Sequence, residues 1–397
     1  MTAHRRRLAI VATHPIQYQI PWFQALAAHP ELEVTVLYVF LPDDTQQGAE
    51  FGVAFQWDIP LLEGYRWQLL ATRPGSDPLR GFRAARLSRP VAELRALKPD
   101  VVLLTGWHNL TLVQLLLACR WLGIPCCVRG DSNGLKPRPR WLRWLHRGFL
   151  MNYQSFLVVG EANRRFYRQN HVPGRKLFDC PHFVDNQRFF RQAHALLSER
   201  DAIRTRWQIP PGAICFCFAG KLIPKKRPLD LLEALDRVVM DAAAPRLHLL
   251  LVGTGELEAE IRDLVSRRNL PVHLAGFLNQ SEIARAYVAA DCLVLPSDYG
   301  ETWGLVVNEA MACGRPALVS DRVGCGPDLV MENLTGAVFP FGDVAALASR
   351  LRELAADPRR LATMGEQARQ RVLEHYAVAN AVSGTLEAVH AMLEPAA

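Results

Sequence analysis

Two glutamates flank the start of a predicted helix in the segment SDYGETWGLVVNEAMACGRP, residues 297–316. Glu301 precedes the helix, which we expect to begin near Gly304, and Glu309 lies more than one turn inside it. The free N–H groups at a helix start bind anions, and nearby carboxylates can accept hydrogen bonds from vicinal hydroxyls. Complementarity to the helix dipole explains Glu301 alone, because Glu309 stands among small and apolar residues. The pair therefore favours an anionic ligand that carries hydroxyl groups.

Lysines follow a second apolar run, in the segment AGKLIPKKRPLDLL. Gly220 permits close backbone approach, and Lys221, Lys225 and Lys226 precede a predicted helix. Cations at such a place suit a diphosphate, although a loop of solvated lysines explains the same pattern. Gly253 follows a third run and would line the same edge. The form G-x-x-x-x-G-K-[ST] is absent, which argues against ATP hydrolysis of that type.

Polar residues also follow apolar runs in the first half of the chain. His14 and Gln17 stand in THPIQYQ, His108 in TGWHNL, and Arg129 with Asp131 in VRGDSNG. Residues beyond strand ends are suited to ligand binding, so these five are candidate contacts for a second substrate. A structural histidine that packs in the core is the alternative interpretation of His108.

The elements that position these residues alternate along the whole chain. Apolar runs rich in branched residues predict strands, and the segments between them have helical periodicity. This alternation, which occurs in both halves, predicts an α/β fold of two doubly wound, Rossmann-like domains that face a cleft between them. The expected strands are 8–12, 34–39, 101–104, 125–128, 156–159, 214–219, 247–252, 272–275, 292–295, 317–320 and 337–339.

A polar segment that ends in IPPG divides the two halves. We expect a first domain over residues 1–190, a linker over 191–212 and a second domain over 213–370. Residues 371–397 are predicted to form a C-terminal helix that either caps the second domain or packs back on the first. The length of 397 residues suits two domains of ordinary size.

The second half resembles the retaining GT-B glycosyltransferases of family four. ETWGLVVNEAMACG is similar to their E-x-F-G-x-x-x-x-E-A-M-A-C-G motif, and FAGKLIPKKRPLDLLEAL resembles their segment VGRL-x-P-x-K-G. LLLVGTGELEAEI, VHLAGFLNQSEIARAYVAADCLVLPS and VSDRVGCGPDLV follow in the order typical of that family. The resemblance is dense from Cys215 to Phe341 and looser before it.

This resemblance implies a role for each matching position. Glu301 and His108 would be catalytic, and His14, Gln17, Arg129 and Asp131 would contact the acceptor. Lys221 stands where relatives more often have arginine, and Thr302 and Trp303 replace a commoner glycine and phenylalanine. The implied donor-binding residues are Gly220, Lys221, Lys226, Gly253, Phe277, Leu278, Thr302, Trp303, Gly304, Leu305, Val306 and Glu309.

The implied reaction transfers a sugar from a nucleotide-sugar donor, a UDP-sugar by preference, to a hydroxyl of a glycan, lipid-linked or small-molecule acceptor with retention of configuration. No D-x-D motif occurs in the chain. We therefore expect no metal site and no cofactor, with lysines and helix N–H groups stabilising the departing diphosphate.

Three other classes of protein remain to be weighed. Nucleotide-sugar 2-epimerases share the implied fold but lack the paired glutamates in this setting. A non-catalytic protein that binds sugars or nucleotides is also an open alternative, although the presence of Glu301, Glu309, Lys221 and Lys226 argues against a loss of activity. A nicotinamide-dependent dehydrogenase would need G-x-G-x-x-G after the first strand, where this chain has ATHPIQYQ.

The net charge of +7 is concentrated in a few basic runs. Residues 136–149 join arginines to tryptophans at helical spacing, which suits an anionic membrane surface as well as a packed helix with a basic outer side. No motif predicts nucleic-acid binding. The nine cysteines form no C-x-x-C pair, and buried free thiols favour the cytoplasm. We expect a cytoplasmic protein, with attachment to the inner face of the membrane as a further expectation.

Overall fold

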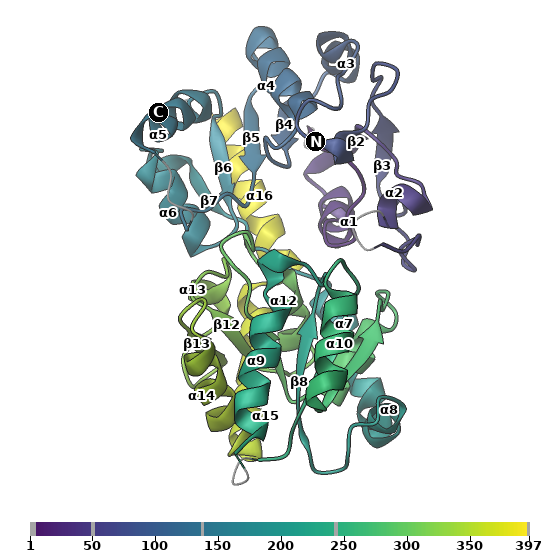
Figure 1. Cartoon of the computed structure of the whole chain (residues 1–397). Coiled ribbons are helices and arrows are strands. Elements are labelled where there is room, and N and C mark those ends of the chain that lie inside the picture. Colours follow the sequence, from purple (N-terminus) through teal and green to yellow (C-terminus); the bar gives the residue numbers. More distant parts are fainter. Residues whose placement is uncertain (1–4, 49–51, 136–138, 242–244, 395–397) are drawn as a thin grey trace. The chain divides into compact units, whose positions relative to one another are not determined.

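A computed structural model describes residues 5–48, 52–135, 139–241 and 245–394 of the chain (Figure 1). The chain forms two compact units. Unit 1 comprises residues 1–46, 60–182 and 378–397, and unit 2 comprises residues 47–59 and 183–377. Each unit contains one parallel sheet in its described part, so the predicted α/β class with two doubly wound units is confirmed.

Unit 1 has a sheet with the strand order β3-β2-β1-β4-β5-β6-β7. The strands are β1 (Arg6–Ala12), β2 (Leu32–Tyr38), β3 (Arg66–Leu69), β4 (Val101–Leu104), β5 (Cys126–Arg129), β6 (Ser155–Val158) and β7 (Leu177–Asp179). The helices are α1 (Ile20–Ala28), α2 (Asp44–Gly48), α3 (Pro90–Leu97), α4 (Leu110–Leu122), α5 (Arg140–Leu150), α6 (Glu161–Gln169) and α16 (Val378–Leu393). Helices α3, α4 and α6 share a core with the sheet.

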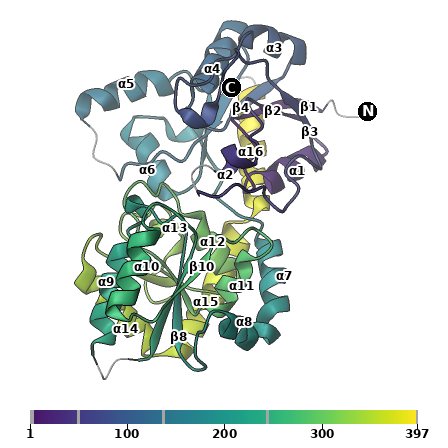
Figure 2. The ribbon, with the colours of Figure 1, turned by 45° about the vertical axis from the view of Figure 1, so that its right-hand side comes forward.

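Unit 2 has a sheet with the strand order β10-β9-β8-β11-β12-β13. The strands are β8 (Ile214–Ala219), β9 (Leu247–Val252), β10 (Val272–Gly276), β11 (Cys292–Leu295), β12 (Ala317–Ser320) and β13 (Gly336–Phe339). The helices are α7 (Asn186–Leu196), α8 (Arg200–Arg206), α9 (Pro228–Val239), α10 (Glu258–Arg268), α11 (Ile283–Ala289), α12 (Leu305–Ala312), α13 (Gly326–Leu329), α14 (Val344–Ala355) and α15 (Pro358–His375). Helices α9, α10 and α14 lie on one side of this sheet, and α7, α8 and α11 lie on the other (Figure 2).

The boundaries between the units differ from the sequence prediction. Residues 191–212 do not form a linker, because α7 and α8 pack on α11 and Arg204 of α8 is bound to Asp291 through an ion pair of 2.8 Å. Unit 2 begins at Phe183 rather than 213, and it also includes residues 47–59 from the β2–β3 connection. The polar composition of 191–212 reflects the outer faces of short helices.

The C-terminal helix α16 packs on α1, β6 and β7 of unit 1 (Figure 1). Gly384 makes this packing close, because a Cβ atom at that position would lie 1.6 Å from the carbonyl oxygen of Asp179. The indole of Trp22 donates a hydrogen bond of 3.2 Å to Thr385 in the same interface. Unit 1 is therefore completed by the last residues of the chain.

Candidate functional site

The carboxyl ends of β8, β9 and β11 bring the predicted residues of unit 2 to one edge of its sheet, which we call the carboxyl edge. Gly220 follows β8 and its N–H donates to the carbonyl of Val252 over 2.9 Å. Gly253 follows β9 with a φ of +125°, and a Cβ there would lie 2.0 Å from the carbonyl oxygen of Gly220. Only glycine fits this contact, so the two loops lie against each other at the backbone.

The carboxylate of Glu301 is held in place at the carboxyl edge. Its Oε2 atom forms an ion pair with Nζ of Lys226 and accepts a hydrogen bond of 3.3 Å from the hydroxyl of Ser297. Both charged side chains are mostly buried, with 13% of Lys226 and 14% of Glu301 exposed. Partial burial strengthens such a pair because water screens it less. The structure thus joins two residues that lie 75 positions apart in the sequence.

Lys221 lies beside this pair with a perturbed protonation equilibrium. Burial, followed by the neighbouring charges of Lys225 and Lys226, lowers the pKa of Lys221 to about 8, and Glu301 opposes the shift. Three ammonium groups in one loop repel one another until an anion neutralises them. The loop is therefore electrostatically suited to a multiply charged anion.

The loop before α12 is fixed by backbone hydrogen bonds. The N–H of Asp298 donates to the carbonyl of Lys225 over 2.9 Å, and the N–H of Gly324 donates to the carbonyl of Glu301 over 3.0 Å. Gly304, with a φ of +102°, precedes the helix without a side-chain cap. The first N–H groups of a helix have no intrahelical acceptor. Those of Leu305 and Val306 are thus available to an anion beside Glu301.

The side chain of Trp303 is not part of a sugar site, which corrects the sequence prediction. It is 4% exposed, its indole N–H donates to Asn308 over 2.8 Å, and its ring lies 6.2 Å from that of Tyr376. An amphipathic ring with a paired N–H is a stable core residue. Trp303 holds the loop against the core of unit 2, and among residues 302–304 only Thr302 is not buried.

Glu309 is completely buried, at 0% exposure, and its Oε2 atom accepts a hydrogen bond of 2.6 Å from the hydroxyl of Tyr287. A direct contact with a ribose therefore requires this side chain to leave the position that it has in the structure. Sequence reasoning missed both Tyr287 and Ser297. Ser297 could have been found, because it lies two residues beyond a buried strand; Tyr287 could not, because it lies in an apolar helix.

Phe277 and Leu278, which the resemblance implies bind the donor, follow β10 at the carboxyl edge, and both are half-buried. The N–H of Gly253 donates to the carbonyl of Gly276 over 2.8 Å, which ties this loop to the glycine loops. The ring of Phe277 lies 4.4 Å from that of Phe55. Phe55 lies in residues 47–59, the segment between β2 and β3 that packs in unit 2. No sequence pattern indicated that Phe55 would reach this edge.

In unit 1, His14, His108 and Asp131 come together at the carboxyl ends of β1, β4 and β5. Burial and the neighbouring His108 lower the pKa of His14 to about 4. Burial of its ring also lowers the pKa of His108, and the negative charge of Asp131 opposes this shift. Because the residue as a whole is exposed, contact with water weakens the shift. Two neutral imidazoles can each exchange a hydrogen bond with a hydroxyl group.

Arg129 and Gln17 are placed differently from the prediction. Arg129 is 7% exposed, and its guanidinium donates to Sγ of Cys180 over 3.2 Å and to the carbonyl of Pro181 over 3.0 Å. It also covers the ring of Trp22 at 5.0 Å. Gln17 is buried as well. Arg129 is therefore a structural residue rather than an acceptor contact, because its donors are used inside unit 1.

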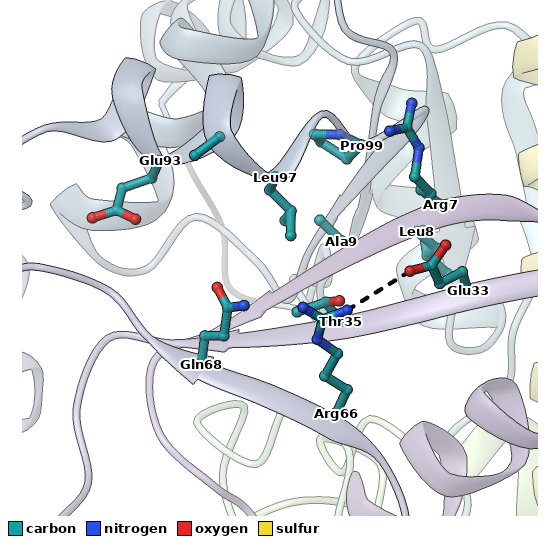
Figure 3. Close-up of a pocket in the computed structure, with 11 residues that line it drawn as sticks. Arg7, Leu8, Ala9, Glu33, Thr35, Arg66, Gln68, Glu93, Leu97 and Pro99 are labelled. Carbon is teal, nitrogen blue, oxygen red and sulfur yellow. Dashed lines mark ion pairs between the residues drawn. The ribbon is translucent and has the colours of Figure 1, made fainter.

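A cavity of about 230 Å³ lies at the opposite, amino-terminal end of the sheet in unit 1 (Figure 3). Arg7, Glu33 and Arg66 line it near the starts of β1, β2 and β3, and Arg66 forms an ion pair of 3.7 Å with Glu33. None of the predicted site residues lines this cavity. It is thus separate from the candidate site.

Helix α5 presents aromatic and basic side chains to solvent. Trp141 and Trp144 are 65% and 75% exposed, and Arg143 and Arg147 are exposed beside them. Residues 136–138 of the predicted basic segment lie outside the described part of the chain. No helix among the described residues is long and apolar enough to cross a bilayer. The opposite face of α5 packs on the core of unit 1 through Phe149 and Leu150, so the packed helix with a basic outer side and the membrane-facing helix both stay open.

Residues 199–371 match the family model described as Glycosyl transferases group 1. The chain is 34% identical over 180 residues to a D-inositol 3-phosphate glycosyltransferase of Streptomyces bingchenggensis, a match that covers 43% of this chain and 39% of the relative. It is 28% identical over 222 residues to the N-acetyl-alpha-D-glucosaminyl L-malate synthase of Bacillus anthracis, which covers 55% of each chain. The chain thus spans about half the length of the curated relatives that it matches.

Solved structures match nearly the whole chain. A glycosyltransferase of Rickettsia africae has a TM-score of 0.74 at 13% identity and covers 99% of this chain and 100% of its own. The HepE protein of Anabaena, solved in complex with UDP and glucose, has a TM-score of 0.69 at 16% identity and covers 97% and 99%. At identities this low the structural matches show the fold alone, and that fold is GT-B.

Proposed function

We propose that this chain, whose residues 199–371 match the family model described as Glycosyl transferases group 1, is a retaining glycosyltransferase. It would move a sugar from a nucleotide-sugar donor to an acceptor hydroxyl without a metal ion or other cofactor. One observation carries the proposal: the carboxylate of Glu301 is held by Lys226 beside the uncapped start of α12. That arrangement offers a hydroxyl-binding acid and an anion site side by side.

The carboxyl edge provides three kinds of group for the donor. Lys221 and Lys226 would neutralise the diphosphate, and the N–H groups of Leu305 and Val306 would bind its distal phosphate. Glu301 would accept hydrogen bonds from the sugar hydroxyls. UDP is the first nucleotide to test, because the structurally similar HepE protein is described in complex with UDP.

The proposed reaction proceeds on one face of the sugar. The acceptor oxygen would form a bond to the anomeric carbon as the bond between that carbon and the diphosphate oxygen breaks. The departing phosphate oxygen would take the acceptor proton, so no protein nucleophile is needed. The lysines and helix N–H groups would stabilise the charge that develops on the diphosphate, which is usually the largest catalytic effect. His14, His108 and Asp131 of unit 1 would orient the acceptor.

A thermal-shift screen of nucleoside diphosphates and nucleotide sugars tests the donor assignment. A ligand that binds the native state raises its stability by mass action, so UDP or another diphosphate should raise the melting temperature of the wild type. Lys226→Ala should weaken that binding by about tenfold or more. Glu260→Ala, an exposed acid on α10, is the matched control. A wild-type shift that persists unchanged in Lys226→Ala would contradict the proposed phosphate site.

Glu301→Gln separates transfer from mere binding. The proposed enzyme should lose most of its sugar transfer with this change while it still binds the nucleoside diphosphate. A non-catalytic binding protein would show no transfer in the wild type, and a 2-epimerase would convert the nucleotide sugar without an acceptor. Product analysis by mass spectrometry distinguishes these outcomes, and addition of EDTA should leave transfer unchanged.

We also propose that α5 attaches the chain to an anionic membrane surface, such as the inner face of a cell membrane. Exposed tryptophans favour the interface between lipid and water, and arginines near an anionic surface contribute about 1 kcal/mol each. Such attachment would suit a lipid-linked acceptor, which we favour among the glycan, lipid-linked and small-molecule classes.

Sedimentation with anionic vesicles of phosphatidylserine and phosphatidylcholine tests the membrane proposal. Arg143→Gln with Arg147→Gln should lower the partition coefficient by roughly thirtyfold, and added salt should mimic the change. Trp141→Ala with Trp144→Ala should weaken binding as well. Met240→Ala, which removes an 80% exposed side chain from unit 2, is the control. Equal sedimentation of all variants would rule the surface out.

A further inference from the structure

Residues 52–59, which we call the strap, are part of the chain between β2 and β3. They pack in unit 2, although both strands belong to unit 1. The side chain of Asn279 donates a hydrogen bond of 2.7 Å to the carbonyl of Gln56. The N–H of Ser281 donates to the carboxylate of Asp58 over 3.1 Å, and its hydroxyl contacts the same carboxylate. The strap is thus bound to the loop that follows β10.

The strap residue Phe55 lies against the loop residue Phe277, and Trp57 packs on Phe55 in turn. The rings of Phe55 and Phe277 are 4.4 Å apart with an angle of 38°, and those of Phe55 and Trp57 are 4.9 Å apart in an edge-to-face arrangement. All three residues remain partly exposed. The loop is tied to the carboxyl edge, since Gly253 donates to Gly276 over 2.8 Å. The strap therefore adds aromatic surface to this edge.

The indole N–H of Trp57 is buried and has no hydrogen-bond partner among the described residues. A buried donor without an acceptor is unfavourable, and native proteins contain few of them. A ligand that brings a carbonyl oxygen to this position would satisfy it. The heterocyclic base of a nucleotide offers both such an oxygen and a flat face that stacks on aromatic rings.

We propose that the strap is a base-recognition element of the donor site, in which Phe55 and Trp57 contact the base of a nucleoside diphosphate. This inference rests on the proposed function, because the lysine loop at the same edge must hold the diphosphate. Phe55 supplies stacking surface that is tolerant of the base, whereas the N–H of Trp57 favours a base with a carbonyl group at its edge, such as uracil.

Isothermal titration of the full chain with UDP and with inorganic pyrophosphate tests the strap. Phe55→Leu and Trp57→Phe should each weaken UDP binding by about fivefold or more, since stacking and buried hydrogen bonds have effects of this size. Pyrophosphate, which lacks a base, should bind all variants within twofold of the wild type. Trp57→Phe should also lower the preference for UDP over ADP, whose base has no carbonyl group.

Phe82→Ala, which removes a 47% exposed ring from unit 1, is the matched control, and thermal unfolding verifies that each variant is folded. Unchanged UDP affinity in both strap variants overturns the inference alone. An equal loss for UDP and pyrophosphate overturns it too, because the strap would then only support the loop. If the wild type binds no nucleoside diphosphate, the proposed function fails and this inference fails with it.

Discussion

At the scale of single residues, Lys221 distinguishes this site from one built on arginine. A guanidinium keeps its charge at any physiological pH, whereas burial and two neighbouring lysines lower the pKa of Lys221 to about 8. The affinity of Lys221 for an anion should therefore change with pH near 8.

Donor binding should weaken as pH rises through 8, because Lys221 then loses the proton that attracts the diphosphate. We expect UDP affinity to fall by up to about tenfold between pH 8 and pH 9. Lys221→Arg should flatten this dependence while it retains binding. Titration calorimetry at pH 7, 8 and 9 measures both, and an equal pH dependence in wild type and Lys221→Arg would show that another group titrates.

Trp303→Phe should change stability rather than sugar preference. The substitution removes the hydrogen bond from the indole to Asn308, both of which are buried. Leaving the Asn308 oxygen without its donor should cost about 1 to 3 kcal/mol in the free energy of unfolding. Urea denaturation measures the loss. A changed ratio of rates among donor sugars, with stability intact, would restore the role predicted from the sequence.

At the scale of elements, helix packing depends on glycine where backbones touch. Gly384→Ala should lower the free energy of unfolding by about 1 to 3 kcal/mol, because the new methyl group would overlap the carbonyl of Asp179. Gly148→Ala is the matched control, since nothing lies within 4 Å of a Cβ added there in α5. The control should be neutral or slightly stabilising. Urea unfolding that ranks the two variants the other way would contradict the packing of α16.

The elements that sequence patterns missed are those at the edge of a sheet. β3 and β7 border the sheet of unit 1, and β3 reads RWQL with mostly exposed side chains. Edge strands need no apolar run, so periodicity does not indicate them. The central strands β8, β9 and β11 are buried on both faces, and their predicted bounds match the structure at every residue.

At the scale of the whole molecule, several histidines are held neutral by the fold. Burial, with His108, lowers the pKa of His14 to about 4, and burial, with His273, lowers that of His248 to about 4. Burial and the charge of Arg129 also hold the pKa of His182 well below its ordinary value. Unfolding frees these groups to take up protons below about pH 6.5.

The free energy of unfolding should therefore fall as the pH drops from 6.5 toward 4, where the unfolded chain binds more protons than the native one. We expect a loss on the order of a few kcal/mol between pH 7.5 and pH 5. Urea titrations at the two values measure it. His248→Gln should reduce the difference, and His194→Gln, an exposed control on α7, should not. Stability that rises on acidification would refute this account.

The sequence by itself determined the α/β class, the central strands, and the glycines, lysines and Glu301 at the carboxyl edge of unit 2. It could do so because strand periodicity and the rule that ligands bind beyond strand ends are local properties. Only the tertiary structure decided that Trp303 and Arg129 are core residues, that Tyr287 binds Glu309, and that residues 47–59 join unit 2. Such outcomes depend on which distant side chains meet, because burial and pairing are set by packing rather than by spacing along the chain.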